Sequence, residues 1–143
     1  MRYHFLENIA TGDIAFEAWG KTLEELFAHA AEALMAVMAA TKKIKPIFNF
    51  QFSIFNKNLD GLLFDFLSEL VFLKDTEQLL FSKFKIKIKT PHPSRYTLIA
   101  NLWGEKIDPK KHKLRSDVKA VTWHMFKVEK EKSGWRAQVV LDI

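Results

Sequence analysis

Three carboxylates are the groups in this chain best suited to chemistry. Asp13 opens a predicted strand in a Gly-containing loop, Asp142 is the penultimate residue, and Ile143 supplies a terminal carboxylate. If the last strand lies next to the strand that begins at Asp13, the three groups converge. Hard oxygen ligands of this kind suit Ca²⁺, Mg²⁺ or Mn²⁺ and not zinc. The residues alone favour the plainer alternative, in which Asp13 only starts a strand and residues 142–143 are an exposed tail.

Most other catalytic arrangements are excluded by residue type. The chain has no Cys, which removes thiol nucleophiles, Fe–S clusters and cysteine zinc sites. Its 5 Gly form neither a P-loop nor a dinucleotide-binding fingerprint. The 5 His are scattered without an H-x-x-x-H pair, and His124 is better interpreted as a surface or hydrogen-bonded residue than as a catalytic base.

The charge of the chain is unevenly distributed. The formal net charge is +5, yet residues 83–119 contain eleven Lys or Arg and three Asp or Glu, so this segment carries +8 and the remainder −3. The segment begins with four Lys at alternate positions, Lys83, Lys85, Lys87 and Lys89. Such asymmetry suggests an anionic partner, either nucleic acid or an acidic protein. The alternative is a solvated face that keeps the protein soluble and discourages edge-to-edge aggregation of strands.

Periodicity predicts the elements that position these residues. Strands are expected where apolar residues alternate, and helices where they recur at intervals of three and four. Thr22 with Glu25 forms a capping box for the first helix, and Asn58 caps the second, which is apolar over much of its circumference and expected to be the more buried. In chain order we predict a strand within 1–7, a loop at 8–13, strand 14–19, helix 22–40, strand 48–54, helix 58–77, strand 83–89, a turn at 91–93, strand 96–102, a loop at 105–117, and a hairpin of 118–129 with 135–141.

This order of elements favours an α+β fold. We expect residues 1–143 to form a single domain with a mostly antiparallel sheet and two amphipathic helices packed on one face. No apolar stretch is long enough to span a membrane, and because patterned sequence follows Met1 directly we expect no signal peptide. The absence of Cys fits a reducing compartment, so we expect a cytoplasmic protein.

Several segments together resemble a known family. They are 5–7, 13–27, 67–70, 75–77, 80–84, 104–105, Asp108, His112, 118–124 and 135–143, in this order along nearly the whole chain. This set is similar to that of the archease family. This chain departs from the usual family pattern at two places. Asn8–Gly12 lacks the His that many members carry just before the first metal-binding Asp of the family, and Trp123 stands where many members have Tyr.

The resemblance implies a function and a site. Archeases are non-enzymatic activators of the RtcB-type tRNA-splicing ligase, promoting its guanylylation and turnover, and some are described as chaperones for a tRNA methyltransferase. The family fold is α+β, and its divalent-metal site, expected to hold calcium, with magnesium or manganese as alternatives, corresponds here to Asp13, Asp142 and Ile143. Lys119 is a candidate contact to a partner or a phosphate, because the hairpin can bring it near Asp142.

Two other functions stay open. An RNA-binding chaperone is suggested by the basic segment from Lys83 to Lys119, with Tyr96 and Trp103 as stacking groups. A metal-dependent hydrolase is less consistent with the sequence, which offers no separate general base near the proposed metal.

Overall fold

The computed structural model describes residues 2–7, 11–92 and 94–143, with backbone only at 91–92. In chain order its elements are β1 (Tyr3–Leu6), β2 (Asp13–Gly20), α1 (Leu23–Met38), the 3₁₀ helix η1 (Thr41–Lys43), β3 (Phe48–Asn56), α2 (Leu59–Glu77), β4 (Leu79–His92), β5 (Arg95–Lys106), β6 (Ala120–Glu131) and β7 (Gly134–Asp142). Residue 93 of the predicted turn at 91–93 and residues 8–10 of the predicted loop at 8–13 lie outside the described residues, whereas residues 91–92 still belong to β4. No helix in the described part of the chain is long and apolar enough to cross a membrane.

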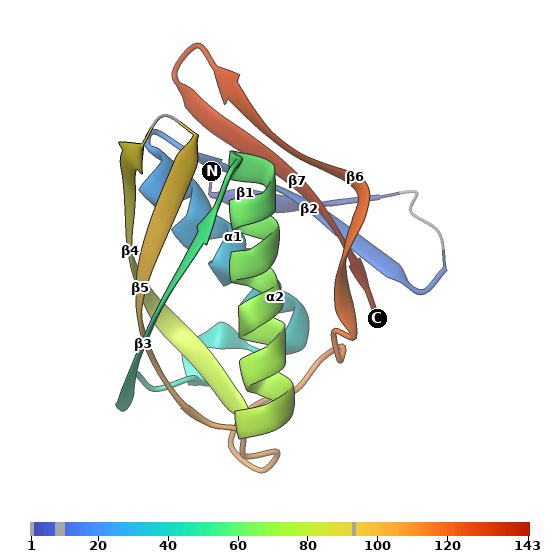
Figure 1. The fold of residues 1–143 in the computed structure, drawn as a ribbon. Helices are drawn as coiled ribbons and strands as arrows, with labels where there is room; N and C mark the ends of the chain where they lie inside the picture. Colours follow the sequence, from blue (N-terminus) through green and yellow to red (C-terminus); the bar gives the residue numbers. More distant parts are fainter. Residues whose placement is uncertain (1, 8–10, 93) are drawn as a thin grey trace.

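The strands form two antiparallel sheets rather than one. Sheet A has the order β1-β2-β7-β6 and sheet C the order β3-β5-β4 (Figure 1). The α+β class is confirmed, but our expectation of one sheet with both helices on one face is wrong. The reason is the connection at residues 107–119, which carries the chain from the end of sheet C to the edge of sheet A, so the two C-terminal hairpins do not pair with each other.

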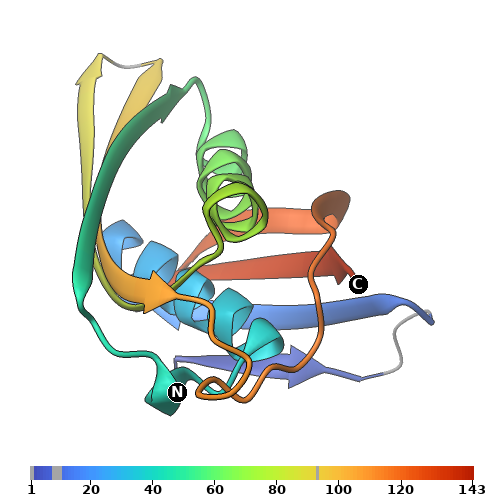
Figure 2. The ribbon, with the colours of Figure 1, turned by 90° about the horizontal axis from the view of Figure 1, so that it is seen from below.

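Helix α1 lies between the two sheets, where it contacts β2 and β4 (Figure 2). The Thr22 hydroxyl accepts a hydrogen bond from the Glu25 amide at 3.1 Å, which caps the helix as predicted. The reciprocal bond differs from the expected capping box, because Glu25 accepts from the amide of Lys21 and not from that of Thr22. Ten of the 16 residues of α1 are buried.

Helix α2 is the more exposed helix, so our expectation about relative burial is wrong. Nine of its 19 residues are buried, and Phe72 is 56% exposed. The Asn58 side chain accepts from the amide of Gly61 at 2.7 Å, which confirms the predicted cap. The helix packs on β6 and β3 at one side of the molecule and leaves the other side to solvent (Figure 1).

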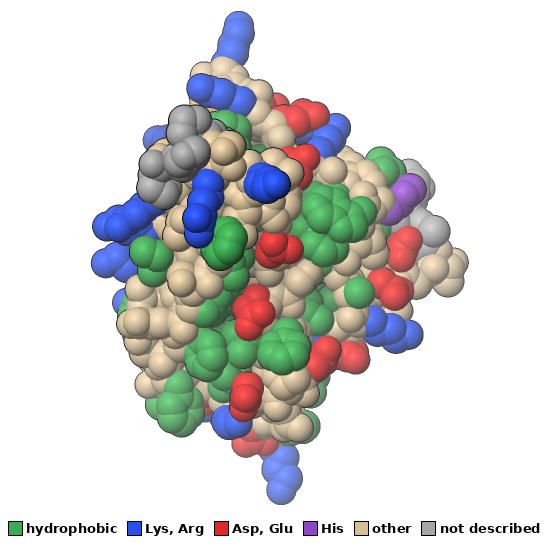
Figure 3. Space-filling model, viewed as in Figure 1, with side chains coloured by type: hydrophobic (Ala, Val, Ile, Leu, Met, Phe, Trp, Pro, Cys, Tyr) green, Lys and Arg blue, Asp and Glu red, His purple; other side chains and the backbone are tan. Residues whose placement is uncertain are grey.

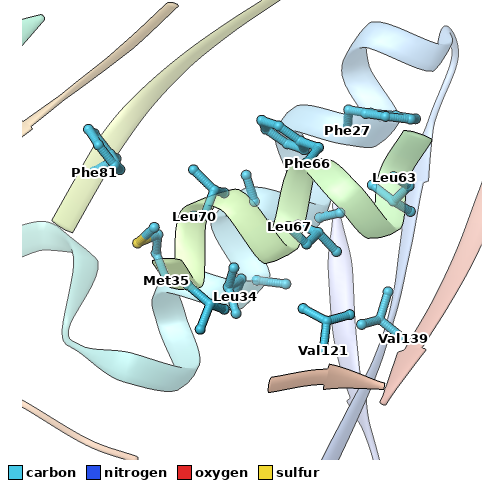
Figure 4. Packing of buried hydrophobic residues seen from close by; sticks show 14 of the residues in the cluster. Phe27, Leu34, Met35, Leu63, Phe66, Leu67, Leu70, Phe81, Val121 and Val139 are labelled. Atoms are coloured by element: carbon cyan, nitrogen blue, oxygen red, sulfur yellow. The ribbon is translucent and has the colours of Figure 1, made fainter. Parts of the chain in front are cut away.

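One hydrophobic cluster joins both helices to both sheets (Figure 4). Phe27 of α1 and Phe66 of α2 stack with ring centroids 5.9 Å apart, and both are fully buried. Phe81 of sheet C and Val139 of sheet A lie in the same cluster. Burial of each such side chain stabilises the fold by roughly 1.5–3 kcal/mol. This shared core fixes the two sheets relative to each other and thereby positions the strand ends.

Candidate functional site

The register of sheet A brings the two predicted aspartates together. Asp13, the first residue of β2, is the antiparallel partner of Asp142, the last residue of β7. Directly opposite residues point to the same face of a sheet, with Cβ atoms about 4.5–5.5 Å apart. Both residues are half-buried, so their carboxylates face each other at an accessible strand end.

The terminal residue is held beside this pair. The amide of Ile143 donates to the carbonyl oxygen of Gly12 at 2.9 Å, which extends the β2–β7 ladder by one bond beyond Asp142. This bond keeps the terminal carboxylate at the same end of sheet A as the two aspartates. The three oxygen-bearing groups expected from the sequence therefore share one strand end.

The pair lacks a cation among the described residues. Neither Asp13 nor Asp142 forms an ion pair with a described residue. By contrast Glu17, two residue pairs further along the same face, forms an ion pair with the guanidinium of Arg136 and lies 3.3 Å from His4 Nε2. Like charges placed directly opposite each other in a sheet are destabilising. The end of sheet A is therefore a place where a bound cation would relieve repulsion.

Lys119 reaches the same end through its backbone. Its amide donates to the carbonyl oxygen of Asp142 at 2.8 Å, and the next residue, Ala120, is the β6 partner of Asp142. The Lys119 side chain is exposed and has no ion-pair partner among the described residues. The structure thus places Lys119 immediately before β6, the strand that pairs with the Asp142 end of β7.

A buried lysine anchors the segment that leads to Lys119. Lys74 Nζ donates to a carboxylate oxygen of Asp117 at 2.6 Å and to the carbonyl oxygen of Val118 at 2.8 Å. Burial lowers the pKa of Lys74, but hydrogen bonds to Asp117 and Asp75 outweigh it, so the pKa is raised and the side chain stays charged. Lys74 therefore fixes the backbone immediately before Lys119.

A second polar cluster anchors the beginning of the same connection. The buried carboxylate of Glu105 accepts hydrogen bonds from the amide of Lys45 at 2.6 Å and from Lys111 Nζ at 2.6 Å, and His112 Nε2 lies 3.0 Å away. His112 Nδ1 accepts from the amide of Asp108, so the proton on the neutral ring is on Nε2 and is donated to Glu105. Burial raises the pKa of Glu105, but the three hydrogen bonds dominate and lower it to about 2.

The sequence analysis missed a bulge of three extra residues in β6, close to the aspartates. Thr122 pairs with Val140 and Lys127 with Gln138, so β6 has three more residues than β7 over this interval. The bulge includes Met125, which has a φ of 54°, and its carbonyl accepts from the Gln138 side chain at 2.9 Å. A change of parity is the available signal: the large apolar residues fall on odd positions from Val121 to Met125 and on even positions from Phe126 to Val128.

The bulge presents an aromatic side chain to solvent. Trp123 stacks on Phe64 of α2, with centroids 4.0 Å apart and planes 5° apart, and Phe126 packs against both rings. Trp123 is nevertheless 57% exposed and Met125 56% exposed. An exposed apolar surface therefore adjoins the carboxylate end of sheet A.

The donor set limits what metal this end can hold. Among the described residues, no group of three or more His, Cys, Asp or Glu side chains is arranged for metal binding. The two aspartates and the terminal carboxylate offer only oxygen, which fits calcium, magnesium or manganese. Calcium takes 6–8 oxygen ligands, so water or groups of another molecule must complete its coordination.

Two helices packed against two antiparallel sheets, with an open carboxylate end, define a small α+β protein. The model of the archease protein family matches residues 3–143. Protein archease of Methanosarcina mazei is 37% identical over 142 residues, covering 99% of this chain and 96% of the relative. Protein archease of Pyrococcus furiosus is 40% identical over 134 residues, covering 93% and 94%. The chain belongs to the archease family.

Solved structures agree with this assignment. The solution structure of Methanobacterium thermoautotrophicum protein 1598 has a TM-score of 0.86 and 38% identity, covering 99% of this chain and 98% of that one. A crystal structure of an archease from Thermotoga maritima, described as a possible chaperone, has a TM-score of 0.64 at 20% identity over 98% of both chains. The second likeness shows the fold alone.

Proposed function

We propose that this archease is a non-enzymatic activator of the RtcB-type tRNA-splicing ligase. It would act in the cytoplasm through a divalent cation held by Asp13, Asp142 and the terminal carboxylate of Ile143. The observation that carries the proposal is the pairing of Asp13 with Asp142, with Ile143 bonded to Gly12 beside them. Family membership supports the class of partner.

The carboxylate end is suited to act on another protein's nucleotide pocket. We expect calcium there, with magnesium and manganese as the alternatives, because only oxygen ligands are present. When bound, the cation would supply positive charge that stabilises charge developing on a phosphoryl group. Asp13 and Asp142 would hold it at an exposed strand end, so that the remaining coordination positions face the partner.

Lys119 would add a second positive group to the same surface. Its backbone is fixed by the bond to Asp142, and its side chain is free among the described residues to meet a phosphate of the ligase-bound nucleotide. Without the cation, the ammonium group of Lys119 can pair with Asp142 instead. Such an exposed pair contributes only about 0–1 kcal/mol to stability.

The test is a guanylylation assay with purified ligase and stoichiometric amounts of the wild type, Asp13→Ala or Asp142→Ala. Both residues lie at strand ends outside the hydrophobic cluster, so the variants should fold normally and lose activation. Calorimetric titration with calcium should show binding to the wild type and none to either variant. Full activation by both variants would reject the assignment of the site.

A chaperone for a tRNA-modifying methyltransferase is the alternative function. The observation in its favour is the exposed apolar surface at Trp123 and Met125, which could cover apolar surface of a client. Light scattering of a heated methyltransferase with the wild type or with Trp123→Ser tests it. Equal suppression of aggregation by both proteins would show that this surface does not bind the client.

A further inference from the structure

Sheet C has one face that turns away from both helices (Figure 2). Its alternate residues Phe50, Phe52, Ile86, Leu98 and Leu102 belong to or pack against the hydrophobic cluster. The register therefore assigns the intervening residues to the outer face. They are Lys83, Lys85, Lys87 and Lys89 on β4, Thr97, Ile99, Asn101 and Trp103 on β5, and Asn49, Gln51, Ser53 and Phe55 on β3.

This outer face is strongly cationic. Its four lysines are exposed and form no ion pair with a described residue. Arg95 adds a fifth cation, with its guanidinium 4.1 Å from the ring centroid of Phe55. None of the outer-face residues is Asp or Glu. Lys and Arg side chains gather accordingly at the β4 side of the molecule (Figure 3).

The spacing of these cations matches a polyanion in extended form. Alternate residues of a strand are about 6.6–6.8 Å apart, so Lys83 to Lys89 form a row about 20 Å long. Successive phosphates of an extended nucleic-acid strand have a similar separation. The row can therefore contact one phosphate with each lysine.

Two aromatic rings lie at opposite ends of the same face. Trp103 is half-buried and lies next to Lys83, whose Nζ is 4.7 Å from the ring centroid. Phe55 is 63% exposed at the other end, opposite Thr97. Unpaired bases stack on such rings, and amide side chains such as Asn101 between them can donate and accept hydrogen bonds.

We propose that the outer face of sheet C binds single-stranded RNA, with its backbone along the lysine row and its bases over Trp103 and Phe55. The choice of RNA over DNA rests on the proposed function; the other features call only for a flexible anion with stackable bases. Protection of the β4 edge explains lysines. It explains neither the aromatic rings at both ends nor the lack of Asp and Glu among the outer-face residues named above. An acidic protein would use the charge but not the rings.

The first test measures the salt dependence of binding without ligase. Fluorescence anisotropy with a labelled oligouridylate of about twelve nucleotides should give a slope of log K against log salt near −3, because each phosphate contact on a single strand contributes about −0.7. The triple variant Lys85→Gln, Lys87→Gln, Lys89→Gln should reduce this slope to about −1. A triple variant with the same charge change at exposed lysines outside the face, Lys110→Gln, Lys113→Gln, Lys132→Gln, should keep a slope near −3.

The second test asks whether bases are recognised. Phe55→Ser, at an exposed position, should weaken oligouridylate binding at least about fivefold and leave the affinity for heparin unchanged. Trp103→Phe, which retains a stacking ring, should bind nearly as the wild type does. A labelled RNA duplex of the same length should bind more weakly, because its paired bases cannot stack on the two rings.

Several outcomes would overturn the inference. The first is no binding of the oligouridylate at low salt, and the second is an equal loss of affinity in both lysine variants. The third is that heparin competes as well as unlabelled oligouridylate while Phe55→Ser leaves the affinity unchanged, which would indicate an acidic protein as the partner. Ligase guanylylation with the Lys85, Lys87, Lys89 variant should stay within about twofold of the wild type. Loss of RNA binding with retained activation therefore separates this surface from the carboxylate end, and a failure of one proposal does not imply a failure of the other.

Discussion

Replacement of Asp13 by Asn should change stability in opposite directions with and without calcium. In a chelating buffer the wild type holds two like charges directly opposite each other, which costs about 0.2–1 kcal/mol. Asn has nearly the same shape and removes one charge, so the free energy of unfolding should rise by about 0.5 kcal/mol. For 143 residues the unfolding entropy is about 0.3 kcal/mol/K, so Tm should rise by about 2 °C.

Calcium should reverse the order of the two proteins. At a free concentration about 100 times Kd, calcium stabilises the wild type by about 2.7 kcal/mol, or about 9 °C in Tm. Asp13→Asn should gain little, because it has lost one of two aspartate ligands, and Asp142→Asn should behave in the same way. Glu77→Gln removes an exposed carboxylate outside the site and should keep the full calcium shift.

Differential scanning calorimetry in EDTA and in calcium measures both effects. A lower Tm of Asp13→Asn in EDTA would show that the Asp13 carboxylate already has a favourable partner in the protein. A full calcium shift in both variants would show that the cation binds elsewhere. Either result would refute the reasoning from the Asp13–Asp142 pair.

Three further predictions follow from the same region and its supports. One added residue after Ile143 converts the terminal carboxylate into an amide, so calorimetric calcium affinity and ligase activation should both fall, whereas an extension before Met1 should leave them unchanged. Lys119→Ala should keep the wild-type Tm and reduce guanylylation of the ligase; unchanged guanylylation would make Lys119 an ordinary surface residue. Glu105 has a folded pKa of about 2 against an ordinary 4.5, so its contribution of up to about 3 kcal/mol is complete above pH 4.5 and is lost as pH falls toward 2. Denaturant titrations from pH 6 to about 2.5 should show a shallower loss of stability for Glu105→Gln than for the wild type.

Local patterns predicted the elements of the candidate site but not their neighbours. Alternating apolar residues indicate the strands that begin at Asp13 and end at Asp142, because burial of one face produces period two. Nothing within either strand specifies its partner, so the meeting of the carboxylates remained conditional until the β2–β7 register was known. The family resemblance supplied the pairing that the residues could not.

The bulge in β6 shows a limit of reading periodicity. Val121 pairs with Leu141 and Val128 with Ala137, so both face the core although their sequence separation is odd. The three extra residues of the bulge return the side chain of Val128 to the side of the strand that faces the core. An alternation read without attention to the shift at Phe126 describes a regular strand and misses the exposed position of Trp123.

Our prediction that α2 is the more buried helix was wrong because it took the number of large apolar residues as a measure of burial. α2 carries large apolar residues around much of its circumference, yet one side of it faces solvent at Phe72. α1 contains Ala30, Ala31, Ala33 and Ala36, all buried. Small side chains allow backbones to approach closely, so α1 can lie between two sheets. A count of large apolar residues gives no information about this packing.

The basic segment that appeared continuous in the sequence is divided by the fold into two surfaces. Its first part forms the lysine row on sheet C, and its last residue, Lys119, lies immediately before β6 of sheet A and bonds to Asp142. The connection between them is held by Glu105 at one end and Lys74 at the other, and both are buried. Charge in the sequence therefore indicated an anionic partner without locating it. Because the two surfaces lie at different sheets, substitutions that remove charge from one surface leave the groups of the other in place, and each surface can be tested separately.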